Sequence, residues 1–533
     1  MQTTQNCSQN LMGFQLFRGR LDLCARCVSL QKMERSSRRH VVSFWDQSEL
    51  LRGAEMDLDT TRSSSSTRAV ARVPSSHRSR RIGAVTEVWR LARWRDSCRA
   101  SWASALLYRD IVKISLPVLP LATPRQRYSC HGCGNCCRDF TVQLRAADAR
   151  RIRDQAWDSR LGVNPIVAFR GREYLRQRAD GSCVFLLDDG RCRVHAEYGF
   201  ESKPIACQMF PYMLAPSEVS SQMGVSFACQ SVIENKGKAL NEQVSDALKI
   251  VMRGLPETVQ PRPRAAIGRG RLAERGELDY LRGRIITWIL RESPMSHRVD
   301  GLAWIAQSLS TARLTNVRGE RFKELVKILF DALGDELPLH PISPPSLRQV
   351  AMLQGAVFAR TEDPKPVAQG APGRFMSTLS QLRRSRLWRK GRGATLVPAI
   401  GLGWSSSVTF DAVSTLPGIH ASPDSPLCDE LLSRWMRASI EGGRIWGSGY
   451  YGWSAIDGLT AFVLSIATVG WLSKLHAAGS SAPSPSLSDL QAAIGRIDRT
   501  SGRAIWLGGW SERMRLAYLA RDDGLRRVAS VQF

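Results

Sequence analysis

Cysteines gather in one stretch of the sequence with the spacing of metal ligands. Eight of the thirteen fall in this stretch: Cys130, Cys133, Cys136, Cys137, Cys183, Cys192, Cys207 and Cys229. The first four spell C-x-x-C-x-x-C-C, and two cysteines separated by two residues can turn back so that both sulfurs face one ion. Gly132 and Gly134 supply the positive φ that such turns require. Thiolates bind zinc, iron–sulfur clusters and copper(I), and disfavour magnesium and calcium. We therefore predict that all eight cysteines are metal ligands.

The spacing does not choose the metal. A bacterial ferredoxin run would place its fourth cysteine at the position of Phe140, followed by proline, and this sequence does not. Eight thiolates could close two tetrahedral zinc sites, hold one four-iron (4Fe–4S) cluster with cysteines to spare, or hold a cluster and a second ion. Buried core cysteines or a disulfide framework explain four cysteines within eight residues less well.

Polar residues beside the cysteines have simpler interpretations. His131 and His195 could bind metal or carry protons, but a histidine next to a turn more often just forms hydrogen bonds. The residues 188–190 (Asp-Asp-Gly) predict a tight turn that brings Cys183 and Cys192 together. Lys203 and Arg138 could balance the negative charge of a thiolate cluster.

The strings CHGCGNCC and CVFLLDDGRCRVHAEYGFESKPIACQMFPY resemble the cysteine-cluster family known for its CxxCxxCC box (YkgJ-like). That family is described as a zinc- or iron-chelating domain and includes the flagellin lysine N-methylases. The resemblance covers about 100 of the 533 residues. Lys203 stands where the family has arginine. The residues that fit the family pattern after the box are Cys183, Leu186, Cys192, Pro204, Cys207, Phe210 and Pro211.

The resemblance implies zinc or iron binding and, more remotely, transfer of a methyl group from S-adenosylmethionine to a lysine of a protein substrate. In the methylases a further cysteine precedes Pro-Gly, whereas here Cys229 precedes Gln230 and Ser231. The one glycine-rich candidate for S-adenosylmethionine, Gly401 and Gly403, is more typical of an ordinary loop. Two hypotheses follow: a protein lysine N-methyltransferase, or a non-enzymatic interaction module organised by metal.

Charge and hydropathy argue against two other classes of protein, those that bind specific nucleic acids and those that span a membrane. The net charge of +27 comes mainly from arginines spread along the chain, without a nucleic-acid-binding motif, so no specific nucleic-acid partner is predicted. The most apolar stretch, Leu459–Leu472, is too short to span a membrane and predicts a buried core helix. The N-terminus lacks the pattern of a signal peptide, so we predict a cytoplasmic protein without a membrane anchor.

The order of elements predicts an α+β protein: a small irregular cysteine-rich metal module followed by a mostly α-helical domain. Residues 1–84 predict a disordered tail or an upstream start codon, and residues 85–127 a helix with a proline-rich lead-in. The metal module is assigned to residues 128–255, with a strand at Phe140–Leu144 and a helix at Ala146–Trp157. After a linker near 256–270, helical patterns fill residues 271–533, beginning at Arg271–Arg291.

Overall fold

The structure, a computed structural model, describes residues 118–119, 126–169, 171–216, 221–254, 264–268, 270–339, 341–362, 371–398 and 404–533. The chain divides into two units, Met1–Tyr108 and Arg109–Phe533. The first, with the predicted tail and the helix predicted at 85–108, lies outside the described residues. The second combines many helices with small sheets, which confirms the α+β class.

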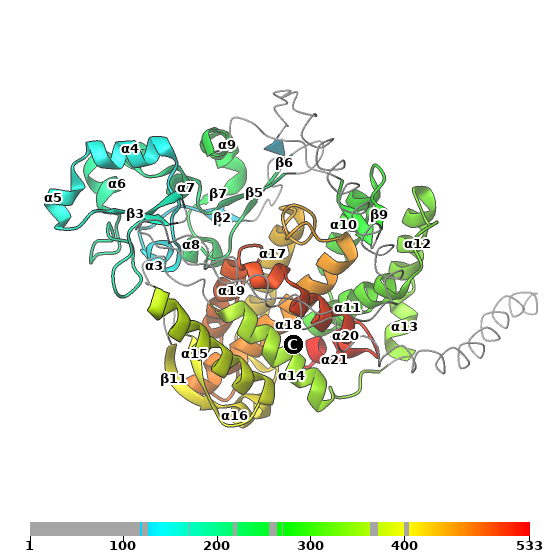
Figure 1. The fold of residues 1–533 in the computed structure, drawn as a ribbon. Helices are drawn as coiled ribbons and strands as arrows, with labels where there is room; N and C mark the ends of the chain where they lie inside the picture. Colours follow the sequence, from blue (N-terminus) through cyan, green and yellow to red (C-terminus); the bar gives the residue numbers. More distant parts are fainter. Residues whose placement is uncertain are drawn as a thin grey trace, which may run out of the picture. The chain divides into compact units, whose positions relative to one another are not determined.

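Residues 126–254, here called the cysteine module, consist of short elements joined by tight turns (Figure 1). The helices are α3 (Asn135–Asp139), α4 (Ala146–Asp154), α5 (Trp157–Leu161), α6 (Arg193–Tyr198), α7 (Ile205–Met209), α8 (Gln230–Ile233) and α9 (Val244–Gly254). The strands are β2 (Arg127–Tyr128), β3 (Ile166–Phe169), β4 (Arg172–Leu175), β5 (Tyr212–Pro216), β6 (Ser221–Val225) and β7 (Lys238–Ala239), and β1 (Val118–Leu119) precedes them. β2 pairs with β7, β3 with β4, and the three-stranded sheet has the order β1-β6-β5.

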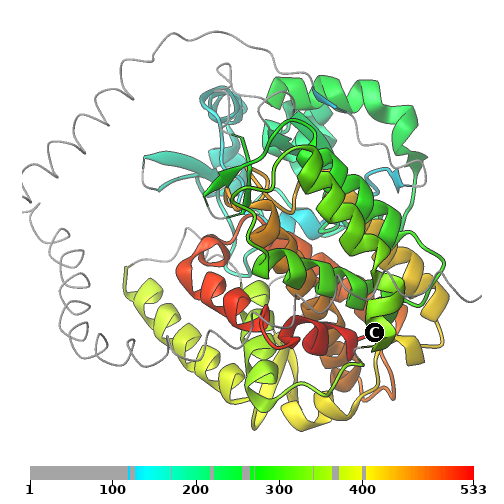
Figure 2. The same ribbon diagram turned by 90° about the vertical axis from the view of Figure 1, so that its right-hand side faces the viewer.

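Residues 264–533, here called the helical part, hold the longer helices. These are α10 (Glu277–Ile289), α11 (Met295–Thr311), α12 (Glu320–Asp331), α13 (Leu333–Leu339), α14 (Leu347–Thr361), α15 (Ala371–Lys390), α16 (Phe410–Thr415), α17 (Ser425–Glu441), α18 (Ala455–Gly479), α19 (Leu487–Thr500), α20 (Trp510–Leu519) and α21 (Gly524–Ser530). Two antiparallel pairs complete it: β8 (Ala266–Gly268) with β9 (Arg271–Leu272), and β10 (Ala394–Pro398) with β11 (Trp404–Thr409). The views in Figures 1 and 2 show α21 beside α11, although they come from opposite ends of the helical part.

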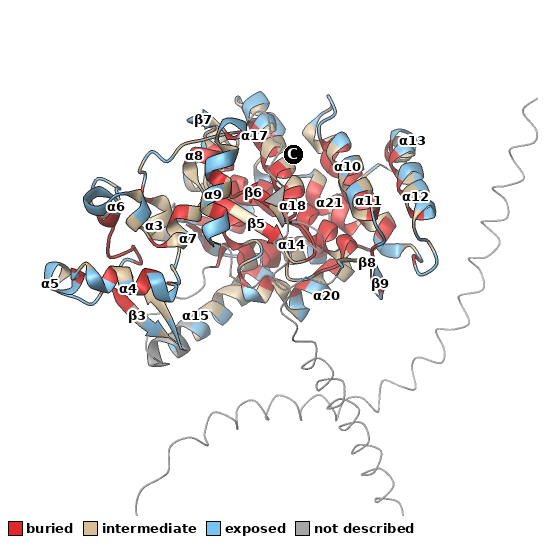
Figure 3. Ribbon diagram, turned by 90° about the horizontal axis from the view of Figure 1, so that it is seen from above, coloured by how far each residue is buried: buried red, intermediate tan, exposed pale blue. Residues whose placement is uncertain are grey.

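Helix α18 lies at the centre of this packing. It contacts α11, α14, α19 and α21, and Figure 3 shows it in the buried colour while the outer faces of α12 and α13 are exposed. Among the described helices it is the one long and apolar enough to cross a membrane, but 94% of its most apolar window is buried inside the protein. A helix that is apolar on all sides must be covered on all sides, which here is done by its neighbours. The prediction of a buried core helix at Leu459–Leu472 is confirmed.

The cysteine module and the helical part share apolar packing. One small core belongs to the module alone and includes Ile152, Trp157 and Phe185. The larger core joins Phe227 and Val232 of the module to the interior of the helical part. The guanidinium group of Arg434 in α17 also donates hydrogen bonds to the carbonyl oxygens of Val232 (3.2 Å) and Ile233 (3.0 Å). The helical part therefore supports the second half of the cysteine module directly.

Several predicted boundaries are wrong. Phe140–Leu144 is not a continuous strand, because only Gln143 pairs, in an isolated bridge with Tyr174. The helix predicted from Ala146 ends at Asp154, since the chain turns at Gln155 and Ala156 takes a positive φ. The helix predicted from Arg271 begins at Glu277, because Arg271–Leu272 forms a strand with Ala266–Gly268, inside the predicted linker.

Candidate metal centre

Cys130 and Cys133 lie on a tight turn that leads into α3, where Cys136 and Cys137 follow. Gly132 and Gly134 have φ of 71° and 72°, which confirms the predicted positive φ. Gly134 caps the helix that carries Cys136 and Cys137. A Cβ atom at Gly134 would lie 3.0 Å from the backbone carbonyl oxygen of Gly190, so a larger residue would also crowd that segment. The glycines therefore set both the path of the turn and its close approach to the next segment.

A second turn, at residues 187–190, aligns the segments of Cys183 and Cys192. The amide of Leu187 donates to the carbonyl of Arg191 (2.9 Å), the amide of Gly190 donates to the carbonyl of Leu187 (3.0 Å), and Leu186 pairs with Cys192. Gly190 has a φ of 85°. The predicted tight turn is confirmed.

Replacing Gly190 with alanine should weaken metal binding, because the two turns touch here. The added Cβ would lie 2.6 Å from the carbonyl oxygen of Gly132 and 3.3 Å from the carbonyl carbon of Cys133. We expect the free energy of unfolding to fall by about 1–3 kcal/mol from backbone strain, and further from the clash, with a lower metal affinity in chelator competition.

Gly171→Ala is the matched control, since Gly171 has a similar φ of 71° but no atom within 4 Å of the added Cβ. This variant should lose only the part of the free energy of unfolding that comes from backbone strain. Equal metal affinities for the two variants would mean that contact between the turns does not position Cys133.

Cys183 and Cys207 are held from different elements. The amide of buried Cys183 donates to the carbonyl of Cys137 (2.7 Å), so these two cysteines are linked through the backbone. Cys207 lies in α7, where the amide of Ile205 donates to the carboxylate of Asp148 in α4 (3.3 Å). The polar side chain of Asp148 thus fixes the start of the helix that carries Cys207.

Cys229 precedes α8, and its loop is anchored by Asp498 of α19. The Oδ2 atom of Asp498 accepts hydrogen bonds from the Ser226 hydroxyl (2.8 Å) and the Ala228 amide (3.3 Å). Its Oδ1 atom accepts from the indole of Trp435 (3.1 Å) and pairs with Arg444 (3.0 Å). Asp498 is almost completely buried. A carboxylate from the helical part therefore positions the last cysteine of the module.

The separate segments converge on one cavity of about 500 Å³. Of the eight predicted ligands, seven line it: Cys130, Cys133, Cys136, Cys137, Cys192, Cys207 and Cys229. Cys183 does not line the cavity and belongs to the small apolar core of the module. Its thiolate interacts electrostatically with those of Cys207 and Cys192. The structure thus brings all eight sequence-predicted cysteines into one neighbourhood.

Burial and mutual repulsion act on these thiols together. Burial, with a smaller contribution from neighbouring cysteine thiolates, raises the pKa of Cys183, Cys207 and Cys229 to about 12 each. Burial alone would lower the pKa of the Lys203 ammonium, but the facing thiolates, Cys207 foremost, hold it above its usual value. The cavity therefore favours positive charge, and a bound cation would stabilise the thiolate form of its ligands.

The electrostatic neighbours divide the cysteines into two groups. Cys183 is influenced by Cys207 and Cys192, and Cys207 by Cys192. Cys133 is influenced by Cys130, and Cys229 by Cys133, while Cys136 influences all four. The same division appears in packing. Cys137, Cys183 and Cys192 contact the core of the cysteine module, whereas Cys229 packs against the larger core. We call the two sets the inner group, Cys137, Cys183, Cys192 and Cys207, and the outer group, Cys130, Cys133 and Cys229. Cys136 neighbours both.

Of the four polar residues predicted to lie beside the cysteines, three line the cavity. His131 and His195 both line it, and burial lowers the pKa of His195, with a smaller contribution from the charge of Lys203. Lys203 lines it as predicted, whereas a guanidinium nitrogen of Arg138 lies 3.4 Å from the carbonyl oxygen of Cys133. Of the two predicted cations, Lys203 is therefore the one that lines the cavity.

The side chains are not drawn together around a single point. Among the described residues, no three histidine, cysteine, aspartate or glutamate side chains are placed to hold one ion as they stand. Closing on an ion would need the thiols to approach one another, which rotation about each Cα–Cβ bond allows. The donor set, all sulfur with histidine nearby, fits zinc or iron.

Other sequence candidates lie elsewhere. Cys428 is buried in α17, where its thiol faces the Ser422 hydroxyl, and it lines neither of the cavities described here. The remaining cysteines and the glycine pair Gly401 and Gly403 lie outside the described residues. The sequence reasoning missed Asp498, which follows Cys229 by more than half the chain, and no local pattern could have connected the two.

Comparisons with known proteins agree with this geometry. Residues 129–236 match the CxxCxxCC family model, described as a "putative zinc- or iron-chelating domain". The chain is similar to an uncharacterized protein, MJ0939, of Methanocaldococcus jannaschii, with 24% identity over 127 residues, which cover 23% of this chain and 43% of that relative. The match thus spans less than half the length of that protein. No solved structure matches the chain significantly. Residues 129–236 are therefore similar to a family that is described as zinc- or iron-chelating.

Proposed function

We propose that the eight cysteines bind zinc or iron and that the cysteine module is a metal-binding domain. The observation that carries this proposal is the convergence of seven cysteines, from both turns, α3, α7 and the loop before α8, on one cavity. Buried thiols with raised pKa values would otherwise stay protonated and inert. Metal binding would displace those protons and add its free energy to that of folding.

The inner and outer groups support two ion positions that meet at Cys136. The inner group could supply a full tetrahedral set of four and the outer group three of four, and a thiolate between them can bridge two ions. The outer group includes Cys130 and Cys133, which are exposed, while the inner group includes buried Cys183. An added chelator should therefore remove the outer ion faster than the inner one.

The test is metal content and an absorption spectrum of the full chain purified without air. Two equivalents of zinc with no visible absorption would support the two-ion arrangement. Iron with acid-labile sulfide and broad visible absorption would support the iron–sulfur form. Protein that retains neither metal at stoichiometric levels would contradict the proposal.

The reaction, if there is one, stays a prediction from the family resemblance. A methyltransferase would bind S-adenosylmethionine saturably and transfer the methyl group to a lysine of a protein substrate. An interaction module would bind a protein partner without it. Equilibrium binding of S-adenosylmethionine to the metal-loaded chain separates these two hypotheses.

A further inference from the structure

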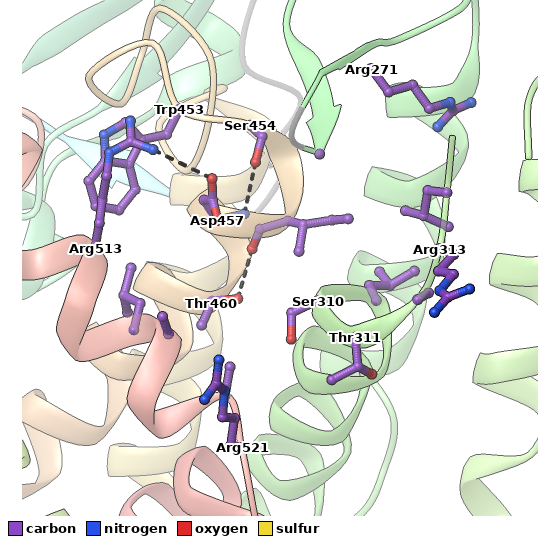
Figure 4. Close-up of a pocket in the computed structure, with 18 of the residues that line it drawn as sticks. Arg271, Ser310, Thr311, Arg313, Trp453, Ser454, Asp457, Thr460, Arg513 and Arg521 are labelled. Atoms are coloured by element: carbon purple, nitrogen blue, oxygen red, sulfur yellow. Dashed lines mark hydrogen bonds and ion pairs between the residues drawn. The ribbon is translucent and has the colours of Figure 1, made fainter. Parts of the chain in front are cut away.

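A second cavity, of about 350 Å³, lies in the helical part and is rich in arginine. Its wall includes Arg271 from β9, Arg313 after α11, Arg513 from α20 and Arg521 after α20. Figure 4 shows these side chains on opposite sides of the cavity, with Arg271 and Arg313 on one side and Arg513 and Arg521 on the other. Elements far apart in sequence therefore concentrate positive charge at one place.

Two buried side chains in this wall have hydrogen-bond donors without acceptors. Arg271 is 3% exposed, and its Nε and one terminal nitrogen have no partner among the described residues. Trp453 is 1% exposed, and its indole nitrogen likewise has no acceptor there. A buried donor left without an acceptor costs about 1–3 kcal/mol. The guanidinium of Arg271 faces Glu277 and Phe322, which do not line the cavity, whereas an anionic acceptor could satisfy the indole nitrogen of Trp453.

The charges in the wall leave a net excess of two positive groups. Arg271 pairs with buried Glu277, and Arg513 pairs with Asp457 (3.7 Å) while its guanidinium stacks on Trp453 (4.6 Å). Arg313 and Arg521 form no ion pair with any acidic side chain that the structure describes. The excess matches an anion with two negative charges.

The N-terminus of α18 also faces this cavity. Ser454, Ile456 and Asp457 line it, and the Ser454 hydroxyl accepts a hydrogen bond from the Asp457 amide (3.1 Å), which leaves its own hydrogen available. The first amides of a long helix carry partial positive charge and have no partner within the helix. The helix therefore adds to the attraction for an anion that the arginines create.

We infer that this cavity is a binding site for a small dianionic ligand, either a phosphate monoester or a dicarboxylate. A volume of about 350 Å³ fits a small metabolite rather than a macromolecule. Arg313 and Arg521 supply the charge for the dianion, and Trp453 and Ser454 supply neutral donors that orient it. The site involves none of the eight cysteines, so it does not depend on the metal centre.

The test is isothermal titration of the full chain with inorganic phosphate, glycerol 3-phosphate and succinate, at constant ionic strength. The double variant R313Q/R521Q should bind the preferred anion at least about tenfold more weakly, because charge-assisted hydrogen bonds are lost. The control R383Q/R386Q removes the same charge from exposed positions on α15 and should bind like the wild type. Metal content should be equal in all three proteins.

Binding of the phosphates alone would identify a phosphate monoester site, and binding of succinate alone a dicarboxylate site. Two outcomes would overturn the inference. One is that none of the three anions binds the wild type. The other is that both double variants lose affinity equally, since the anion would then be held by the general basic charge of the chain.

Discussion

Replacing Cys133 and Cys136 together with serine should strip metal from the cysteine module and unfold its first turn. Serine fits sterically, because Cys133 is exposed and Cys136 half-buried, so the loss would come from the missing ligands. Cys136 neighbours both groups, and its removal should affect both ion positions. The metal-binding free energy of a structural zinc site is about 10 kcal/mol or more at neutral pH, and the stability of the module should fall by a large part of that.

Elemental analysis of the purified variant, with denaturant unfolding followed by metal release, measures both effects. Cys428→Ser is the matched control, since Cys428 is buried in α17 outside the cluster. That variant should keep its full metal content. If the double variant also kept stoichiometric metal and wild-type stability, the assignment of the ligands would be wrong.

The second large effect is expected from Asp498→Asn. The substitution would leave the guanidinium of Arg444, which is 7% exposed, without its buried partner. Removing one member of a buried ion pair typically costs about 3–5 kcal/mol. Asparagine would also replace one acceptor oxygen by a donor, so either Trp435 or the pair Ser226 and Ala228 would lose its acceptor. We therefore expect lower stability together with weaker metal binding, because the loop of Cys229 loses its anchor.

The carboxylate of Asp498 should also make the free energy of unfolding depend on pH in the acidic range. Burial alone would raise the pKa of Asp498, but Arg444 and the hydrogen bonds from Ser226 and Trp435 hold it below its usual value. A lowered folded-state pKa gives stability that is complete above the unfolded pKa, about 3.9, and is lost as the pH falls through the folded value. The difference in unfolding free energy between the wild type and Asp498→Asn should therefore be constant near neutral pH and shrink below about pH 4.

Asp279→Asn is the control for this effect, because Asp279 is 75% exposed and pairs only at the surface with Arg282. It should change the free energy of unfolding by no more than about 0.5 kcal/mol. An equal loss in the two variants, or a gap that widened in acid, would contradict the role given to Asp498.

Local rules predicted the parts of the site that depend on neighbouring residues. Gly132 and Gly134 could be assigned a positive φ because cysteines two residues apart need a turn between them. The turn before Cys192 followed from Asp-Asp-Gly, which has few other conformations available. The buried helix α18 followed from its apolar composition.

The predictions that were wrong concern residues whose partners lie far away in the sequence. Residues 140–144 have the alternation of a strand, but only Gln143 finds a partner, Tyr174, so the ladder does not form. Arg271 joins a strand rather than the helix after it because Ala266 to Gly268 lies alongside. The arginine cavity has no sequence signature, since its members are single residues at the ends of separate elements.

The hydrogen bonds from Ser226 and Ala228 to Asp498 also set an order of events during synthesis. All eight cysteines leave the ribosome before the residue that anchors the last of them. At about 5–20 residues per second, the interval between Cys229 and Asp498 lasts roughly 15–50 s. During that time the nascent chain carries thiols whose final arrangement does not yet exist, and they are open to oxidation or to a wrong metal. If the cysteines bind metal as proposed, we expect secure loading to follow the folding of the C-terminal helices.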